Sequence, residues 1–254
     1  MKKAVSIMLL MLVFFVFPGM SEAKEEHGHA LHWGYTGEAG PEHWGKLAQE
    51  YGVCSEGKGQ SPVDIQGAYK ADLKPFQVDY KEAPLRIINN GHTIQVNFDA
   101  GSSVTIDDQK YELAQFHFHT PSEHKVVGKV YAGELHLVHK GKEGALAVVG
   151  VFLEKGEPNK AIQALLDNLP ETVNQERGIR GINVNASELL PKDLGFYRYF
   201  GSLTTPPCSE IILWTVLKNP VQVSEEQLQK LSKVMGENAR PVNPIGRRYI
   251  LESQ

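Results

Sequence analysis

The chain has 254 residues, which is long enough for one large domain that buries most of its surface. Apolar residues make up 41% and charged residues 22%, a composition that excludes a disordered or fibrous protein. The net charge is near −4, without a long basic stretch. A nucleic-acid-binding protein normally carries a basic footprint, so no nucleic-acid partner is expected.

The first residues have the pattern of a secretory signal peptide. Lys2-Lys3 precedes an apolar run over residues 4–17, and small residues end at Ala23, as a signal peptidase requires. The run is short for a transmembrane span, and no second run of membrane length follows. We therefore expect a periplasmic or secreted protein that has no membrane association after cleavage. The predicted parts are a signal peptide over 1–23, a flexible His-containing N-terminus over 24–30 and a domain over 31–254.

Segments with β-strand character follow one another along the chain, separated by turn residues. They are residues 85–88, 92–98, 103–106, 111–119, 134–139, 146–153 and 211–217. Two segments, 158–169 and 224–235, carry apolar residues at helical spacing, and Ser224 is a typical N-cap for the second. The sequence therefore predicts a β-rich α+β fold in a single domain with peripheral helices.

The chain has two cysteines, Cys54 and Cys208. In an oxidising compartment such a pair is expected to form a disulfide. The alternative is two buried free thiols. A bridge would fasten the residues that lie just before Cys208.

Three histidines on two predicted strands indicate a metal site. Alternate residues of a strand point to the same face, so His117 and His119 present two imidazoles side by side. If the strand over residues 134–139 lies nearby, His136 completes a set of three nitrogens. Three neutral histidines with an open fourth position suit catalytic zinc, whereas structural zinc sites are closed by four ligands. The alternative is that each histidine is satisfied separately in the core.

A second metal motif also starts at these histidines. His117 and His119, followed by Glu123, fit the core of a cupin motif, which would imply an iron or manganese oxygenase or isomerase. That motif expects glycine six positions before the first histidine and seven after the glutamate. This chain has Tyr111 and Val130 there, which disfavours the cupin interpretation.

Several runs follow one another in order from His32 to the C-terminus. The longest are QFHFHTPSEH (115–124), ELHLVH (134–139) and GSLTTPP (201–207), and shorter ones are 32–35, 40–44, 60–65, 89–92 and 238–241. Together they resemble the α-class carbonic anhydrases, in particular the exported bacterial type. The resemblance implies a central twisted, mostly antiparallel sheet with zinc at the base of a conical cleft. It also implies cis peptide bonds at Ser61-Pro62 and Pro206-Pro207, and it allows a homodimer, since bacterial members often form dimers.

The resemblance also assigns the metal centre. It implies that His117, His119 and His136 bind Zn²⁺, that Gln115 holds His117, and that Glu134 accepts from the free ring nitrogen of His136. Bound zinc lowers the pKa of its water to about 7, for which carbonic anhydrase is itself the standard example. The resulting hydroxide would attack CO2.

The resemblance also implies that Thr204 orients this hydroxide and that the Thr204 hydroxyl donates to the Glu123 carboxylate. His92 resembles the proton shuttle, with Tyr35, Asn90 and Gln95 along the water path. The apolar pocket for CO2 would be formed by Val138, Val148, Leu203, Thr205, Ile212 and Trp214. His124 and His139 are expected to be structural or exposed. His27, His29 and His32 are expected to belong to a solvated tail, and the alternative is that they gather a metal ion.

The sequence therefore predicts a zinc lyase, a carbonic anhydrase that interconverts CO2 and bicarbonate with histidine-mediated proton transfer. A different class of function is a catalytically silent binding module on the same fold. Such relatives typically lose a zinc histidine, and this chain keeps all three.

Overall fold

The computed structural model describes residues 32–170 and 172–254. The predicted signal peptide and N-terminal segment, with His27 and His29, lie outside these residues. No helix in the described part of the chain has the length and apolar character needed to cross a membrane.

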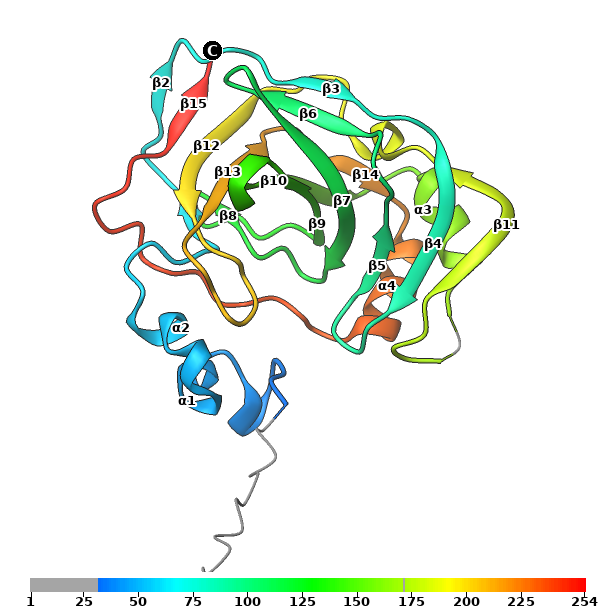
Figure 1. Ribbon diagram of the computed structural model, residues 1–254, viewed down its shortest axis with the longest axis horizontal. Helices are drawn as coiled ribbons and strands as arrows, with labels where there is room; N and C mark the ends of the chain where they lie inside the picture. Colours follow the sequence, from blue (N-terminus) through cyan, green and yellow to red (C-terminus); the bar gives the residue numbers. More distant parts are fainter. Residues whose placement is uncertain (1–31, 171) are drawn as a thin grey trace, which may run out of the picture. The chain divides into compact units, whose positions relative to one another are not determined.

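Strands dominate this part of the chain (Figure 1). They are β1 (Asp64–Ile65), β2 (Tyr69–Ala71), β3 (Gln77–Asp79), β4 (Ala83–Asn89), β5 (Ile94–Asn97), β6 (Ser103–Ile106), β7 (Gln109–His119), β8 (Lys125–Val126), β9 (Gly133–Lys140), β10 (Leu146–Lys155), β11 (Arg177–Val184), β12 (Phe196–Gly201), β13 (Ile212–Leu217), β14 (Val221–Val223) and β15 (Leu251–Ser253). The α-helices are α1 (Trp44–Leu47), α2 (Val53–Glu56), α3 (Lys160–Leu166) and α4 (Glu225–Met235).

One large sheet organises the fold. Its strands follow the order β11-β4-β5-β7-β9-β10-β13-β12-β15-β2, with β14 beside β10 and with β6 between β3 and β7. Most neighbours are antiparallel, and β10–β13, β10–β14 and β15–β2 are parallel. The predicted β-rich single domain with a mostly antiparallel central sheet and peripheral helices is confirmed.

The two faces of the sheet bury different sets of side chains, because alternate residues of a strand point in opposite directions. On β10, Val149 and Val151 belong to the larger apolar core, which α3 and α4 cover with Ile162 and Leu231. Val148, on the other face of β10, belongs to a second apolar cluster. His117 and His119 of β7 and His136 of β9 lie on this second face.

Some element boundaries differ from those expected. His92 precedes β5 because its backbone N–H and that of Thr93 donate to Asn90 Oδ1, at 3.0 and 2.9 Å, and so close a turn. The first predicted helix is shorter, since α3 begins only after Asn159, whose side chain accepts from Ile162 N–H. Ser224 forms the expected cap of α4, in a capping box closed by Gln227.

Backbone geometry near the site agrees with the family resemblance. The peptide bonds Ser61-Pro62 and Pro206-Pro207 are cis, and Thr120-Pro121 is a further cis bond among the described residues.

Candidate metal centre

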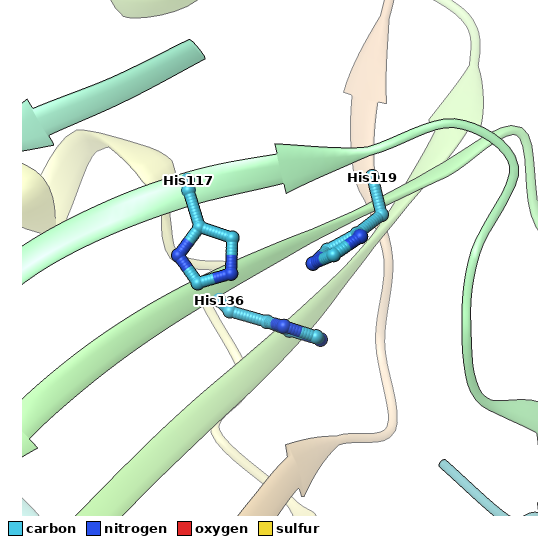
Figure 2. Close-up of side chains that lie close together, drawn as sticks. All are labelled: His117, His119 and His136. Carbon is cyan, nitrogen blue, oxygen red and sulfur yellow. The ribbon is translucent and has the colours of Figure 1, made fainter. Parts of the chain in front are cut away.

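Three histidines converge from two adjacent strands. His117 and His136 are directly paired across β7 and β9, and His119 lies two residues along β7 on the same face. One ring nitrogen of each histidine lies within 4.8 Å of the others. Figure 2 shows the three rings turned toward a common point. The set of three nitrogens that the sequence predicts is therefore brought together.

Each ring is held by its second nitrogen. His117 Nδ1 donates to Gln115 Oε1 at 2.8 Å, and His119 Nδ1 donates to the backbone oxygen of Asn238 at 2.7 Å. His136 Nε2 donates to Glu134 Oε1 at 2.9 Å. These bonds leave His117 Nε2, His119 Nε2 and His136 Nδ1 as the nitrogens that face one another, and they fix the tautomer of each ring.

The charge state of the rings suits metal binding. Burial, followed by the neighbouring imidazoles, lowers the pKa of His117 well below its usual value, and burial also lowers the pKa of His119. Neutral imidazoles are the form that binds a metal. His119 Nε2 is buried without a hydrogen-bond partner among the described residues, a costly arrangement that a metal ligand bond would relieve. The donor set therefore fits zinc.

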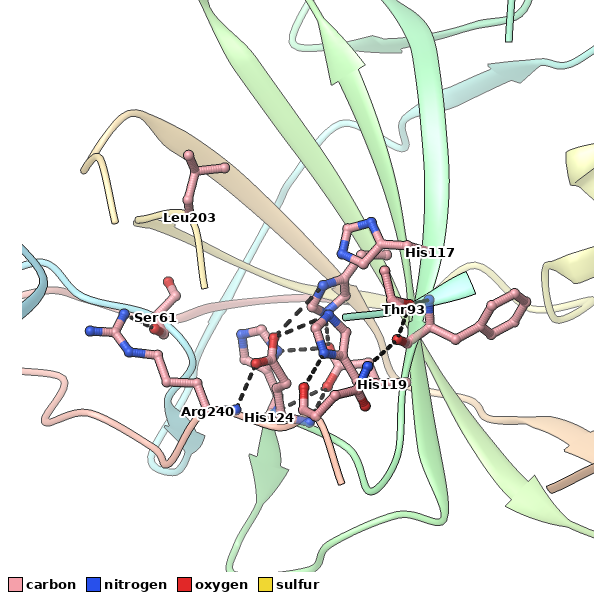
Figure 3. A network of polar contacts seen from close by, with 12 residues as sticks. Ser61, Thr93, His117, His119, His124, Leu203 and Arg240 are labelled. Atoms are coloured by element: carbon pink, nitrogen blue, oxygen red, sulfur yellow. Dashed lines mark hydrogen bonds and ion pairs between the residues drawn. The ribbon is translucent and has the colours of Figure 1, made fainter. Parts of the chain in front are cut away.

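Glu134 connects the metal centre to a deeper network of hydrogen bonds. Figure 3 shows this network of polar contacts, with His117, His119 and His124 labelled. Its Oε1 also accepts from His124 Nδ1 at 2.7 Å, and its Oε2 accepts from the backbone N–H groups of Glu123 and His124. Burial alone would raise the pKa of Glu134, but His124 and His136 lower it well below its usual value. Glu134 therefore stays ionised and holds His136 from a fixed position.

The network continues away from the three histidines. His124 Nε2 lies 2.6 Å from the Tyr199 hydroxyl, which lies 2.8 Å from Ser61 Oγ. His124 is thus structural, with both ring nitrogens occupied. His124, Glu134 and His136 also lie close enough to resemble a second metal group, but their hydrogen bonds already account for the contacts between them.

Glu123 faces the open side of the histidine set. Its Oε1 accepts from the backbone N–H of Arg240 at 2.8 Å. Its Oε2 lies 3.5 Å from His119 Nε2 and 3.9 Å from His136 Nδ1, and it has no hydrogen-bond partner among the described residues. Thr204 is buried. The hydrogen bond from Thr204 to Glu123 stays a prediction, and Oε2 is the free acceptor that it requires.

The loop that carries Thr204, residues 202–211, is fastened at both ends. Cys208 forms a disulfide with Cys54 of α2, as predicted, with a Cα–Cα distance of 5.0 Å. Gln60 Nε2 donates to the Cys208 backbone oxygen at 3.1 Å, and the Ser202 backbone N–H donates to Ser61 Oγ at 3.1 Å. These bonds tie the loop to the segment around Ser61, so Thr204 has little freedom to move.

The predicted substrate pocket is a row of apolar side chains beside the histidines. Val138 lies two residues after His136 and is paired with Val148, which is paired in turn with Trp214. Ile212 belongs to the same apolar cluster, and Leu203 packs against it. Thr205 is partly exposed, and its backbone oxygen accepts from Cys208 N–H at 2.9 Å.

His92 lies in the turn between β4 and β5. Its ring stacks on Trp33 with centroids 3.7 Å apart and planes inclined by 7°, and its Nε2 lies 3.0 Å from His32 Nε2. Burial and the nearby His32 lower its pKa. His32 therefore contacts a residue of the predicted site, whereas the sequence placed it in a solvated tail. Asn238 Nδ2 donates to the His92 backbone oxygen.

The residues predicted along the proton path lie near one another. Asn90 Nδ2 donates to Gln95 Oε1 at 3.5 Å, and Gln95 is paired with His117 across β5 and β7. The Tyr35 ring lies 6.5 Å from that of His92. Burial and the negative charge of Glu123 raise the pKa of Tyr35, so its hydroxyl keeps its proton.

Comparison with known proteins decides the family. A family model described as eukaryotic-type carbonic anhydrase matches residues 39–254. The chain belongs to this family.

Relatives cover most of the sequence. The chain is 45% identical over 88% of its length to a carbonic anhydrase of a Nostoc species, covering 86% of that protein. It is 46% identical over 88% of its length to a carbonic anhydrase of Klebsiella pneumoniae, covering 92% of that protein. The structure of the α-carbonic anhydrase of Thermovibrio ammonificans with sulfanilamide superimposes with a TM-score of 0.84, at 47% identity over 87% of this chain and 98% of that one. The chain is thus a carbonic anhydrase, a lyase.

Sequence reasoning about this family member missed several residues that hold the site. Asn238 is buried, positions His119 through its backbone oxygen, and donates to the backbone of Phe118 at 2.9 Å. Tyr199 and Ser61 extend the Glu134 network. The signal for Asn238 was its place in the run over residues 238–241, which resembles the family but carries no metal-binding residue type.

His139 lies on β9 but faces away from the metal centre. It is fully buried, with Nε2 2.8 Å from the Tyr80 hydroxyl and Nδ1 3.3 Å from the Ala147 backbone oxygen. Burial lowers its pKa to about 4 from an ordinary 6.5. Of the two predicted alternatives for His139, structural or exposed, it is structural.

The pKa of His139 predicts acid sensitivity. Between pH 6.5 and 4, the His139 ring binds a proton in the unfolded chain but not in the folded chain. The contribution of the neutral ring to stability is therefore complete above this window and is lost as the pH falls through it. Replacing His139 removes this effect. Between pH 7 and pH 5, the unfolding free energy of His139→Gln should therefore fall by about 2 kcal/mol less than that of the wild type. Urea unfolding at the two pH values measures this difference, with His43→Gln, at an exposed position, as the control. An unchanged pH dependence in His139→Gln would contradict the assignment.

Proposed function

We propose that this chain is a zinc enzyme that catalyses the reversible hydration of CO2 to bicarbonate and a proton. The observation that supports this best is the set of three imidazoles, each oriented by its second nitrogen, beside the free carboxylate oxygen of Glu123. His117, His119 and His136 would hold the ion. When bound, zinc supplies a Lewis acid that brings the pKa of water near 7.

Glu123 and Thr204 orient the oxygen nucleophile. The Glu123 carboxylate is fixed by the Arg240 backbone N–H at Oε1, which leaves Oε2 to accept from the Thr204 hydroxyl. A hydroxyl that donates to a carboxylate has only its lone pairs left for its other neighbour. Thr204 then accepts a hydrogen bond from the nucleophile and directs the remaining lone pair of that oxygen toward the substrate. Such positioning reduces the entropic cost of the attack.

The substrate binds against the apolar row beside His136. CO2 has no net dipole, and the side chains of Val138, Val148 and Trp214 offer it a surface from which water is easily displaced. Leu203 and Ile212 complete this surface, with Thr205 at its partly exposed side.

His92 carries the proton out. Its pKa is lowered by burial and by His32, so the ring is neutral near pH 7 and can accept a proton at a ring nitrogen. Asn90, Gln95 and Tyr35 line the space between His92 and His117 with polar groups that order water. The Nε2 atom of His32 lies 3.0 Å from that of His92.

Export is part of the proposal. The N-terminal pattern predicts cleavage after residue 23 and a periplasmic or secreted enzyme, and the Cys54–Cys208 disulfide suits an oxidising compartment. A homodimer stays a prediction.

Metal analysis together with a hydration assay tests the proposal. Purified mature protein should contain about one zinc per chain and hydrate CO2, and dipicolinate should abolish the activity until zinc is restored. A folded protein without bound metal and without activity would instead support the catalytically silent binding module. Stoichiometric iron would favour the cupin-like oxygenase.

His92→Ala tests the proton path separately from the attack on CO2. The attack takes place at the histidine set, so kcat/KM for CO2 should change little, whereas kcat in a bulky buffer should fall by at least about tenfold. Added imidazole should restore kcat by carrying the proton. His43→Ala is the control at an exposed position. Equal losses in kcat and kcat/KM, without rescue, would mean that His92 shapes the site instead of transferring a proton.

A further inference from the structure

A cavity lies beside β12 and β13, and Arg198 of β12 is among its lining residues. Phe196 of β12 packs in the larger core and Tyr199 in the second cluster, so Arg198 points to the face away from the histidines. A cavity of about 450 Å³ opens here. Leu73, Leu213 and Leu251 form its apolar walls, and the exposed rings of Phe200 and Tyr249 stand at its edge. The volume is in the range of small-molecule sites.

Arg198 is the unusual residue of this cavity. It lines the cavity and is 5% exposed, yet only one of its nitrogens is paired: Nη1 lies 3.1 Å from Asp107 Oδ2. Nε and Nη2 are buried without partners among the described residues. Its guanidinium carbon lies 4.5 Å from the centre of the Phe196 ring. A buried guanidinium with unused donors is costly unless an acceptor reaches it.

Buried polar atoms without a hydrogen-bond partner are concentrated at two places in the described chain. Five buried side-chain nitrogen or oxygen atoms in the described residues lack a partner. Two of them, on His119 and Glu123, belong to the metal centre. The other three are the two Arg198 nitrogens and Thr215 Oγ1, and Thr215 is directly opposite Arg198 across β12 and β13. In the described chain, such atoms therefore gather at only one place besides the metal centre, around Arg198 and Thr215.

Charge also points to an anion. Three ionisable groups with a full charge line the cavity, namely Arg198, Arg248 and Asp107, so the lining carries one excess positive charge. Arg248 donates to backbone oxygens, including those of Gly59 and Gln60, and is committed to the fold. Arg198 keeps the free donors, and one carboxylate would neutralise the lining. A guanidinium binds a carboxylate with two parallel hydrogen bonds.

We propose that this cavity binds a monocarboxylate with an apolar body. The carboxylate pairs with Arg198, and the hydrocarbon lies between the leucine side chains and the two aromatic rings. A bare inorganic anion would leave the apolar walls unfilled, and a neutral hydrocarbon would leave the guanidinium unpaired. Arg198 and Leu213 point from the face of the sheet opposite the three histidines, so a carboxylate on Arg198 would not contact the metal centre.

Calorimetric titration of the full mature protein with benzoate tests the proposal. Benzoate should bind at least tenfold more tightly than benzyl alcohol, which has the same ring and no charge. Arg198→Met should weaken benzoate binding at least tenfold, and Arg247→Met, which removes the charge of an exposed arginine outside this cavity, should not. Leu213→Trp, which keeps Arg198 and fills the cavity, should also abolish binding.

Each outcome bears on the proposal. Equal affinity for benzoate and benzyl alcohol in the wild-type protein would overturn it, and this comparison needs no variant. Benzoate binding that persists in both Arg198→Met and Leu213→Trp would place the carboxylate elsewhere, including at the metal, and would also overturn it. Competition by chloride at equal ionic strength would reveal a site for any small anion, which contradicts a ligand with an apolar body.

Discussion

His119→Ala should release the metal from the purified protein and lower CO2 hydration by more than about a hundredfold. The reason is geometric. Nε2 of His119 is buried, has no partner among the described residues, and faces the free nitrogens of His117 and His136. Loss of a residue that merely orients a metal ligand typically costs 10- to 100-fold in affinity or activity, and loss of the ligand itself should cost more.

Two further variants separate metal binding from folding. His117→Ala removes the partly exposed member of the set and should have the same effect with a smaller disturbance of the core. Gln115→Ala removes only the acceptor of His117 Nδ1, so it should keep zinc and lose about tenfold in zinc affinity. Elemental analysis measures the zinc content of each variant, circular dichroism its folding and the hydration assay its activity. A folded His119→Ala protein with full zinc content and full activity would refute the site.

Local sequence patterns predicted most of the sheet but missed its outer strands. The strand containing His117 alternates clearly, and β10 is a long apolar run, so both were found. β11 and β12 were missed for different reasons. β11 is broken by a register shift between Ile179 and Asn183 and is largely exposed, which removes the apolar signal. β12 places Arg198 in a buried position, where the pattern leads one to expect an apolar residue.

The metal centre was predictable to the extent that it depends on two neighbouring strands. Spacing placed His117 and His119 on one face, and the chemistry of imidazole suggested the third ligand. The partners that orient the rings come from farther away. Asn238 lies 119 residues from His119 and contributes a backbone oxygen, a group that every residue has. The role of that oxygen as the acceptor for His119 leaves no trace in local patterns, so only the assembled fold reveals it.

The same limit applies to the loop that carries Thr204. Its motif indicated a hydroxyl near the metal, but its rigidity arises from contacts with Cys54, Gln60 and Ser61, between 141 and 154 residues away. Buried hydrogen bonds and a cross-link together restrain the backbone on both sides of Thr204. A hydroxyl held in this way can orient a nucleophile without the entropic cost of being ordered first.

Thr204→Ala should keep zinc and lose about a hundredfold in kcat/KM for CO2, the typical cost of removing one hydrogen-bonding group that acts on the reacting oxygen. The side chain is small, and the loop is fastened by Cys208 and Ser202, so the fold should tolerate the change. Glu123 Oε2 would lose the donor that the proposal assigns to it. The nucleophile would still form, but it would no longer be directed toward CO2.

The matched variants distinguish orientation from packing. Thr204→Ser keeps the hydroxyl and should retain activity within about fivefold of the wild type, whereas Thr204→Val keeps the shape, lacks the hydroxyl and should behave like alanine. Zinc content should be equal in all three variants. If valine were as active as serine, packing alone would explain the role of Thr204. If all three kept the wild-type rate, Glu123 Oε2 would have to accept from another donor, and the orientation of the nucleophile would need a different source.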